Sequence, residues 1–300
     1  MDTGNGRDRA LRIVTFNILP FAYRVVADWA ERHGHELALV VTTPGPASRR
    51  NVSYREIVAG VPPTQEVVVT SKVGRLAPYL AALAPDLVVS FTFPYLIPPA
   101  ITALPRLGAI NLHPTPLPRY RGPNPLRQLY DGATTLGATL HRTEAGFDTG
   151  AILSQQERPL PDELTPERLG RTLAEVSAAA LEEGAARAIA GEPGTPQDHA
   201  GATYAARFGA EDDRLAWDVP GRLLACRVLA LLMAGHEPRI ALDGADYAIR
   251  RAQSTVGPDS AAPPGGVLAR AGDTWTIGVA DGAVEVVLAP PAAERPASIF

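Results

Sequence analysis

An alternation of apolar patterns near the N-terminus constrains the fold of this chain more than any other feature. Residues 11–16 (LRIVTF) form an apolar run of strand length, and residues 37–41 (LALVV) form a second one. Between them, apolar residues recur at helical spacing over Tyr23–His33, and Gly34 marks the helix end. Two buried strands separated by a helix predict a βαβ unit, and therefore a parallel sheet.

The same alternation continues over the first two thirds of the chain. Thr165, Pro166 and Glu167 form a helix start signal, and the helix is expected to run to about Ile189. Residues 44–63 are expected to be an irregular loop, which holds three arginines but no phosphate-binding glycine signature. The sequence therefore predicts an α/β, Rossmann-like domain with a mostly parallel sheet, whose further strands lie at 67–70, 87–91, 109–112, 136–141 and 152–156.

A second, smaller domain is expected at the C-terminal end. Residues 191–203 are rich in Gly and Pro and resemble a linker, and a helix is expected over Gly221–Met233. Short alternating strands separated by Gly and Pro turns then predict a β-rich, barrel-like domain. We expect a disordered tail at 1–10, a catalytic domain at 11–190, a linker at 191–203 and a C-terminal β-rich domain at 204–300.

Composition narrows the cellular context. The longest apolar runs fall short of the roughly 18 to 20 residues that span a membrane, and the polar N-terminus does not resemble a secretory signal. A single cysteine, Cys226, cannot form an internal disulfide, which favours a reducing compartment. We therefore expect a cytoplasmic protein with no membrane partner. The net charge of −4, from 28 basic and 32 acidic residues, is a poor basis for general nucleic-acid binding.

The segment AINLHPTPLP, at 109–118, carries the first chemically informative pair. Asn111 and His113 are two residues apart at the end of an expected strand, so their side chains point to the same side of the sheet. Pro114 ends the strand directly after the histidine. An amide donor beside an imidazole suits the attack of an amine on a carbonyl carbon. A purely structural role, in which both residues cap the strand, is the alternative.

Asp148, in the segment GFDTG, is the third candidate. It follows His113 by 35 residues, which is enough for one helix and one strand to return the chain to the same edge of the sheet. A carboxylate near an imidazole orients the ring and favours its protonated form. The alternative is that Asp148 and the two residues after it form an ordinary turn.

These two motifs, in this order and at this separation, resemble those of the folate-dependent formyltransferases. The resemblance rests on INLHPTPLPRYRGPNP at 110–125 and GFDTGAILSQ at 146–155, and it covers roughly residues 11–205. It implies that Asn111, His113 and Asp148 form the catalytic group, and that 10-formyltetrahydrofolate is the formyl donor with no metal required. ATYAARF, at 202–208, and the residues after it are similar to the C-terminal domain of the methionyl-tRNA branch.

The resemblance also places the pterin pocket of the donor, at 91–97 and 143–147. There it implies Phe93, Tyr95, Leu96 and Phe147 as cofactor-binding residues. The neighbouring Arg119 and Arg121 have two interpretations: they pair with carbonyl groups or surface acids, or they attract an anionic group of a substrate. His141 is interpreted as a strand residue that faces core or solvent, and not as a catalyst.

The acceptor amine is the point on which the family divides. Residues 204–300 hold 9 arginines and no lysine against 12 acidic residues, a charge that would repel a tRNA backbone. The basic loop expected of the tRNA branch near residues 43–52 offers only Arg49 and Arg50. We therefore favour a small-molecule amine, such as an amino sugar, an amino acid derivative or a hydroxylamine. Initiator tRNA is the main alternative, followed by hydrolysis of the donor and by non-catalytic folate binding.

Overall fold

The computed structural model describes residues 9–44, 53–255 and 262–289, and the chain divides into two compact units. The first unit comprises residues 1–123, 136–158 and 171–204, and the second comprises 124–135, 159–170 and 205–300. Most of the tail expected at residues 1–10 lies outside the described residues, as do Arg49 and Arg50.

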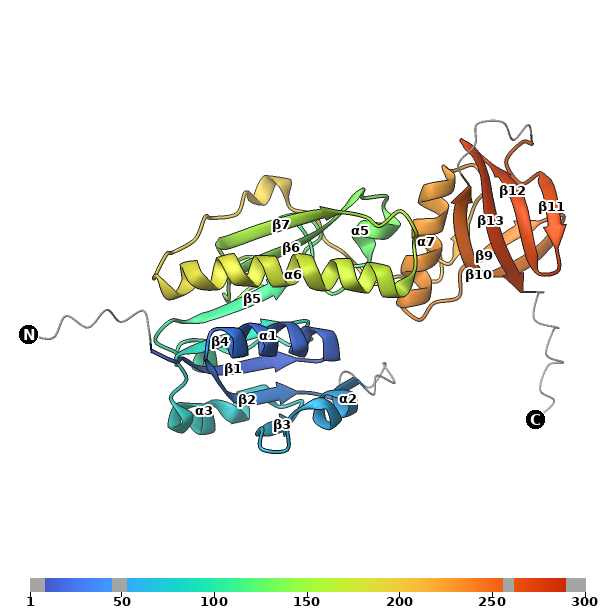
Figure 1. Cartoon of the computed structure of the whole chain (residues 1–300). Coiled ribbons are helices and arrows are strands. Elements are labelled where there is room, and N and C mark those ends of the chain that lie inside the picture. The colour runs from blue at the N-terminus through green and yellow to red at the C-terminus, as the bar shows by residue number, and fades with distance from the viewer. Residues whose placement is uncertain (1–8, 45–52, 256–261, 290–300) are drawn as a thin grey trace, which may run out of the picture. The chain divides into compact units, whose positions relative to one another are not determined.

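The first unit is built on a seven-stranded sheet (Figure 1). Strands β1 to β5 pair in parallel, whereas β6 runs antiparallel to β5. This mostly parallel sheet confirms the fold class that the alternating pattern predicts. In spatial order its strands are β3 (Val67–Val69), β2 (Glu36–Thr42), β1 (Arg12–Asn17), β4 (Leu87–Phe91), β5 (Ala109–His113), β6 (Thr135–Arg142) and β7 (Ile152–Pro159).

Both faces of the central part of this sheet are buried, because neighbouring residues of β1, β4 and β5 belong to two different apolar clusters. Ile13 belongs to the cluster that contains residues of α1 (Pro20–Arg32) and α6 (Pro166–Ile189). Val14 belongs to the cluster on the other face, with η1 (Val73–Leu76), α3 (Ala77–Leu83) and α4 (Pro99–Thr102). Since both faces are apolar, polar side chains of the central strands are concentrated where the strands end.

Thr165 begins helix α6 in the way the sequence predicts. Its hydroxyl accepts a hydrogen bond from the backbone N–H of Arg168 at 3.2 Å, which satisfies one of the free donors of the first turn. Pro166 is the first helical residue. The buried small and aliphatic residues of α6 contribute to the sheet cluster, and they are Val176, Ala180, Leu181, Ala185 and Ala188.

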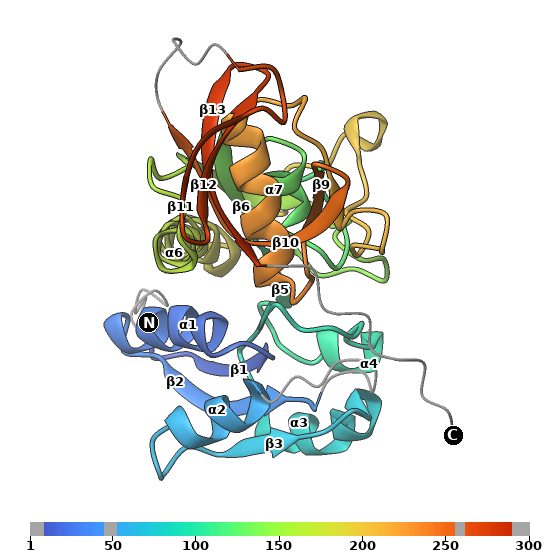
Figure 2. The same cartoon turned by 90° about the vertical axis from the view of Figure 1, so that its right-hand side faces the viewer.

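The second unit contains a six-stranded sheet on which helix α7 (Gly221–Met233) packs, chiefly against β10 (Figure 2). The short helix α5 (Arg127–Tyr130) also contacts α7. β11 and β8 are the two end strands of the sheet. In spatial order its strands are β11 (Val267–Ala271), β12 (Thr274–Val279), β13 (Gly282–Ala289), β10 (Ala245–Thr255), β9 (Arg239–Leu242) and β8 (Arg214–Leu215).

Four segments differ from the sequence-based expectation. Helix α2 (Ser53–Gly60) lies where an irregular loop was expected, and Ile57 is its one fully buried apolar residue. Strands β8 and β9 were not predicted, because they are two and four residues long. Residues 191–203, expected to be a linker, pack within the first unit, where Thr195 pairs with Ile152 through two backbone hydrogen bonds of 2.7 and 2.8 Å.

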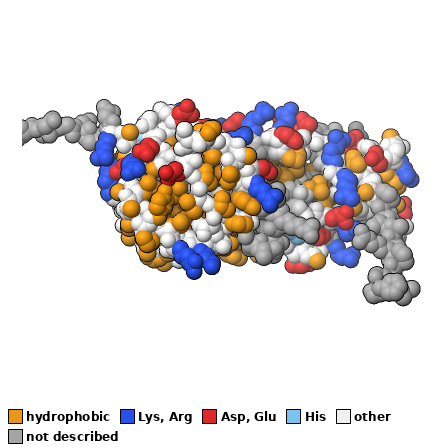
Figure 3. Space-filling view, turned by 90° about the horizontal axis from the view of Figure 1, so that it is seen from below, with side chains coloured by type: hydrophobic (Ala, Val, Ile, Leu, Met, Phe, Trp, Pro, Cys, Tyr) orange, Lys and Arg blue, Asp and Glu red, His pale blue; other side chains and the backbone are white. Residues whose placement is uncertain are grey.

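The edge strand β3 is only three residues long, which limits the backbone it offers to other strands. Figure 3 shows many apolar side chains on a face of the first unit, mixed with polar ones. Val58 of α2, Val69 of β3 and Tyr79 of α3 are among the exposed large apolar residues of that unit. Within the described part of the chain, no helix combines the length and apolarity needed to cross a membrane.

Candidate functional site

Asn111 lies on β5, between a serine of β4 and a histidine of β6. Ser90 Oγ donates a hydrogen bond of 2.5 Å to Asn111 Oδ1, and Asn111 Nδ2 donates one of 3.1 Å to His141 Nε2. The other ring nitrogen of His141, Nδ1, donates to the Arg142 carbonyl at 2.8 Å, so in the neutral form of the ring Nε2 is the acceptor. These bonds fix which end of the Asn111 amide is the oxygen and which is the nitrogen.

His113, the last residue of β5, is buried, and one of its ring nitrogens is held by the main chain. Its Nε2 donates a hydrogen bond of 2.9 Å to the carbonyl of Tyr120. Because a carbonyl only accepts, the neutral ring carries its proton on Nε2 and leaves Nδ1 as the basic nitrogen. That nitrogen lies 3.4 Å from Asp148 Oδ1.

Asp148 reaches the site from the loop between β6 and β7, and its carboxylate is surrounded by donors. The backbone N–H of Gly122 donates to Oδ2 at 2.8 Å, and Asn111 Nδ2 donates to Oδ1 at 3.4 Å. Burial by itself would raise the pKa of Asp148, but His113, His141 and the Gly122 N–H outweigh it and lower the pKa to about 2. The carboxylate is therefore ionised at neutral pH.

The neighbouring imidazole is neutral at the same pH. Burial has the largest effect and lowers the pKa of His113 below its ordinary value of 6.5, while Asp148 and the Tyr120 carbonyl act in the opposite direction. His141 adds a smaller lowering effect. A neutral imidazole that faces an ionised carboxylate is prepared to accept a proton, because the resulting imidazolium lies beside a negative charge.

The structure thus brings together the three side chains that the sequence singles out. An amide N–H suits the oxygen of a carbonyl under attack, an imidazole suits the proton of the attacking nucleophile, and a carboxylate suits the imidazolium that forms. All three lie at the carboxyl ends of parallel strands or in the loop packed against them, where open α/β sheets bind ligands.

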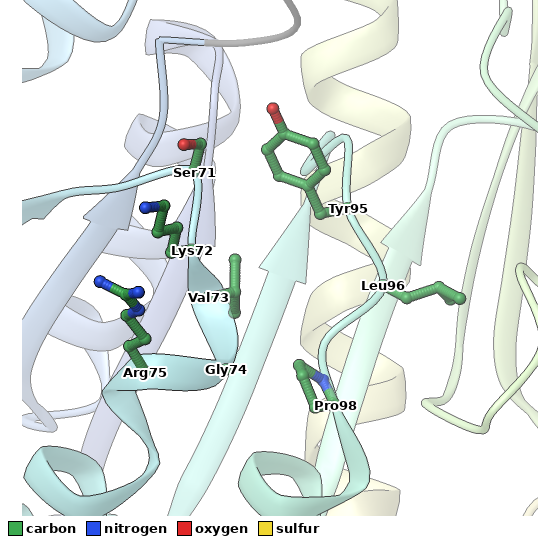
Figure 4. A pocket seen from close by; sticks show the side chains of 8 residues that line it. All are labelled: Ser71, Lys72, Val73, Gly74, Arg75, Tyr95, Leu96 and Pro98. Atoms are coloured by element: carbon green, nitrogen blue, oxygen red, sulfur yellow. The ribbon is translucent and has the colours of Figure 1, made fainter.

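The four residues expected to bind the cofactor fall into three settings. Tyr95 and Leu96 line a hollow of about 390 Å³ together with Ser71, Lys72, Val73, Gly74, Arg75 and Pro98 (Figure 4). Phe93 contacts Tyr95, with ring centroids 5.9 Å apart, and packs edge-on against Phe16 at 5.3 Å. Phe147, next to Asp148, is 52% exposed.

This hollow carries positive charge at the carboxyl edge of β3 and β4. Lys72 and Arg75 stand on one side of it and Tyr95 on the other, while Leu96 extends away from the two cations (Figure 4). Lys72 is the one lysine of the sequence. In the described part of the chain, neither cation forms an ion pair. The hollow therefore suits an anionic group joined to an apolar or aromatic body.

Ser90, His141 and Gln197 contact the three central residues, and sequence reasoning gave none of them a role in the site. His141 is buried and meets Asn111, although it was interpreted as a strand residue without function. The one available signal is register: a histidine on the neighbouring antiparallel strand, directly opposite Asn111. Of the two loop arginines, Arg121 donates to Gln197 Oε1 and Arg119 lies 4.0 Å from Glu157.

Two further observations concern other chemistry. Among the described residues, His, Cys, Asp and Glu form no group of three or more that could hold a metal ion. Cys226 is buried on α7, and burial raises the pKa of its thiol to about 11. A protonated buried thiol is a poor nucleophile, so Cys226 packs as a small apolar residue.

The first unit thus combines an α/β fold with three side chains that suit attack on a carbonyl carbon. Residues 12–184 match the formyl transferase family. The methionyl-tRNA formyltransferase of Thiobacillus denitrificans is 34% identical over 266 residues, which cover 86% of this chain and 84% of the relative. That of Xylella fastidiosa (strain 9a5c) is 32% identical over 280 residues, 92% of this chain and 87% of the relative.

Solved structures share the fold at lower identity. An N-formyltransferase from Helicobacter canadensis, solved with folinic acid and dTDP-3-aminofucose, has a TM-score of 0.65 at 13% identity and covers 93% of this chain and 99% of its own. HypX from Aquifex aeolicus, solved with tetrahydrofolic acid, has a TM-score of 0.61 at 20% identity and covers 93% of this chain and 44% of its own. This chain belongs to the formyl transferase family, and it is a formyl-transfer enzyme.

Proposed function

We propose that this enzyme transfers the formyl group of 10-formyltetrahydrofolate to an amine through Asn111, His113 and Asp148. The observation that carries the proposal is the placement of these side chains, which meet within hydrogen-bonding reach at one edge of the sheet. The donor is a substrate that supplies an activated formyl carbon bonded to N10. During the reaction the acceptor nitrogen bonds to that carbon, the bond from carbon to N10 breaks, and one proton moves from the amine to N10.

His113 handles that proton. Because its Nε2–H is engaged by the Tyr120 carbonyl, Nδ1 is the atom that accepts the proton of the attacking amine. Asp148 Oδ1, 3.4 Å away, stabilises the imidazolium by charge. The imidazolium then returns the proton to N10 as the leaving nitrogen departs.

Asn111 stabilises the negative charge that develops on the formyl oxygen. One hydrogen of its Nδ2 is directed to His141 at 3.1 Å, whereas the contact with Asp148 is 3.4 Å and weak. The weakly held hydrogen is the one available to the formyl oxygen. Ser90, through its bond to Oδ1, keeps the amide from turning over.

The hollow of Figure 4 is the proposed site for part of the donor. A pterin joined to an acidic tail combines an aromatic body with carboxylates, which matches an apolar wall beside Lys72 and Arg75. Tyr95 and Leu96 line the hollow, and the Phe93 ring packs edge-on against the Tyr95 ring. Phe147 is proposed as a contact on the exposed side of Asp148.

The proposed acceptor is methionyl initiator tRNA, which replaces the small amine favoured by the charge count. The support is the name shared by the two relatives above, each matched over more than four fifths of its length. A small-molecule amine is the second candidate. It is supported by the acidic C-terminal region and by the fold shared with an enzyme solved with an amino sugar nucleotide.

Ion pairing within the second unit is the physical reason to retain a small-molecule amine as the second candidate acceptor. Arg239 pairs with Asp246 at 2.8 Å, Arg250 with Glu237 at 3.1 Å, and Arg251 with Glu285 at 2.8 Å. Figure 3 shows basic and acidic side chains side by side over this unit. Cations that are already neutralised by carboxylates have less to gain from phosphates.

Substitution of the two strand-end residues tests the catalytic roles. Asn111→Ala removes one oxyanion donor and is expected to lower kcat by about 10²- to 10³-fold. His113→Ala removes the proton carrier and is expected to lower it by about 10²- to 10⁴-fold. Steady-state kinetics measures both effects, and circular dichroism verifies that each variant is folded. Near-normal turnover in either variant would contradict the proposed mechanism.

Asp148→Asn tests the electrostatic role of the carboxylate through pH. Activity requires neutral His113, so the rate falls as the pH drops through the His113 pKa, which burial holds below 6.5. Asp148 raises that pKa, and its removal is therefore expected to move the acid limb of the profile to lower pH and to reduce the plateau. An acid limb that stays in place would remove the carboxylate from this role.

Lys72→Met and Arg75→Met test the donor site. Each substitution removes an exposed cation, so we expect KM for 10-formyltetrahydrofolate to rise roughly 2- to 5-fold with kcat preserved. The increase should shrink at high salt. Arg158→Met, on the exposed side of β7 at the opposite end of the sheet, is the matched control and should leave KM unchanged. If all three variants kept the wild-type KM, the acidic tail of the donor would have to bind elsewhere.

A direct competition decides the acceptor. The enzyme is incubated with 10-formyltetrahydrofolate and either methionyl initiator tRNA or a panel of amino sugars, amino acids and hydroxylamines, and the formylated products are quantified. We expect kcat/KM for the charged tRNA to exceed that for every small amine. The reverse order would establish the second candidate, and formate release that needs no amine would identify a hydrolase.

A further inference from the structure

Gln197 lies in the segment expected to be a linker, yet its side chain is buried beside the loop that carries Asp148. It is anchored from both directions along the chain. Upstream, Thr195 pairs with Ile152 through two backbone hydrogen bonds. Downstream, Asp198 accepts a hydrogen bond from the backbone N–H of Ala200 and caps the short helix η2 (His199–Gly201). The position of Gln197 is therefore fixed by its neighbours.

Every polar atom of the Gln197 amide is used. Its Nε2 donates to the carbonyl of Asp148 at 2.9 Å and to the carbonyl of Gly150 at 2.7 Å. Its Oε1 accepts two hydrogen bonds from Arg121, of 3.2 Å from Nε and 2.6 Å from Nη2. One side chain thus joins the Asp148 loop to the loop that follows His113.

The Asp148 backbone needs such support. Its φ angle of 55° lies in the left-handed region, which is unfavourable for a residue with a side chain unless the surroundings impose it. Gln197 binds the carbonyls on both sides of Thr149 and so fixes the turn that orients Asp148. Only glycine fits at position 150 in this turn, because a Cβ there would come within 1.8 Å of the Arg142 carbonyl oxygen.

The Gln197 amide is also connected to the Asp148 carboxylate through the Arg121 loop. Asp148 Oδ2 accepts a hydrogen bond from the N–H of Gly122, the residue that follows Arg121. Gln197 binds the Arg121 side chain, so it holds both the backbone that presents the carboxylate and the loop that receives it.

We infer that Gln197 is a positioning residue for formyl transfer, which holds the Asp148 carboxylate against His113 by tying the Asp148 turn to the Arg121 loop. The inference rests on the roles proposed above for His113 and Asp148. It predicts that loss of the amide withdraws the carboxylate from the imidazole without removing any group that touches substrate.

The test measures the protonation of His113 directly in the unliganded enzyme and so depends on no acceptor. The imidazole Cε1–H resonance, assigned by its loss in His113→Ala, is followed by NMR over pH. In wild-type enzyme Asp148 and His141 are the titratable groups that influence His113. Gln197→Met keeps the length of the side chain and removes its hydrogen bonds. We expect the His113 pKa to fall in this variant, in the same direction as in Asp148→Asn, and kcat to fall about tenfold.

Gln65→Met is the matched control. Gln65 also donates from Nε2 to two main-chain carbonyls, those of Leu37 at 2.9 Å and Glu66 at 3.2 Å, but it lies at the other end of β2. Gln65→Met removes the same kind of amide-to-carbonyl hydrogen bonds and should leave the His113 titration in place. If Gln197→Met does not fold, Gln197→Asn replaces it. The asparagine side chain is one methylene shorter and cannot reach all the partners of Gln197. We therefore expect a decrease in the His113 pKa that is smaller than the one in Gln197→Met.

A double-mutant cycle separates positioning from general destabilisation. Because Gln197 acts through Asp148, adding Gln197→Met to Asp148→Asn should cause little further change in the His113 pKa or in kcat. Additive effects, or a wild-type titration in Gln197→Met, would overturn the inference. If Asp148→Asn itself leaves the His113 pKa unchanged, the failure lies in the proposed role of Asp148 and not in that of Gln197.

Discussion

A carboxylate can remain ionised inside a protein only where donors replace the water it has lost, and Asp148 meets this requirement at the edge of the sheet. Gly122 supplies a main-chain N–H from the loop that follows His113, and Asn111 supplies an amide from β5. The segments around the site must therefore come close together at this carboxylate. The left-handed turn at Asp148, the absence of a side chain at Gly150 and the buried amide of Gln197 all follow from that requirement.

The sequence reveals much of this architecture because the relevant signals are local. Alternating apolar runs locate the strands, and the order Thr165, Pro166, Glu167 locates the start of α6. Asn111 and His113 are placed by strand periodicity, and Asn111 meets Ser90 of the parallel strand β4 and His141 of the antiparallel strand β6. The proximity of Asp148 to His113 depends on topology, and the ordered pair of motifs is sufficient to anticipate it.

Other features are determined by contacts between segments distant in sequence. Helix α2 gives a weak pattern because only Ile57 is fully buried, and β8 is too short for any periodicity. Gln197 lies among Gly and Pro residues typical of a linker, and its value to the site depends on carbonyls about fifty residues away. The protonation pattern of His113 depends on the Tyr120 carbonyl, which composition does not reveal.

The reliance of the site on main-chain atoms has an evolutionary consequence. Tyr120 holds the His113 ring through its carbonyl, and its φ of 60° lies in the left-handed region, which restricts the residues that this position accepts. Two residues further on, Gly122 also acts through its backbone, but its φ of 106° and the Tyr204 ring, 2.5 Å from where a Cβ would stand, exclude a side chain. Both loop positions should therefore be limited by backbone geometry, and a restricted set of residues at 120 and 122 would record that geometry more than chemistry.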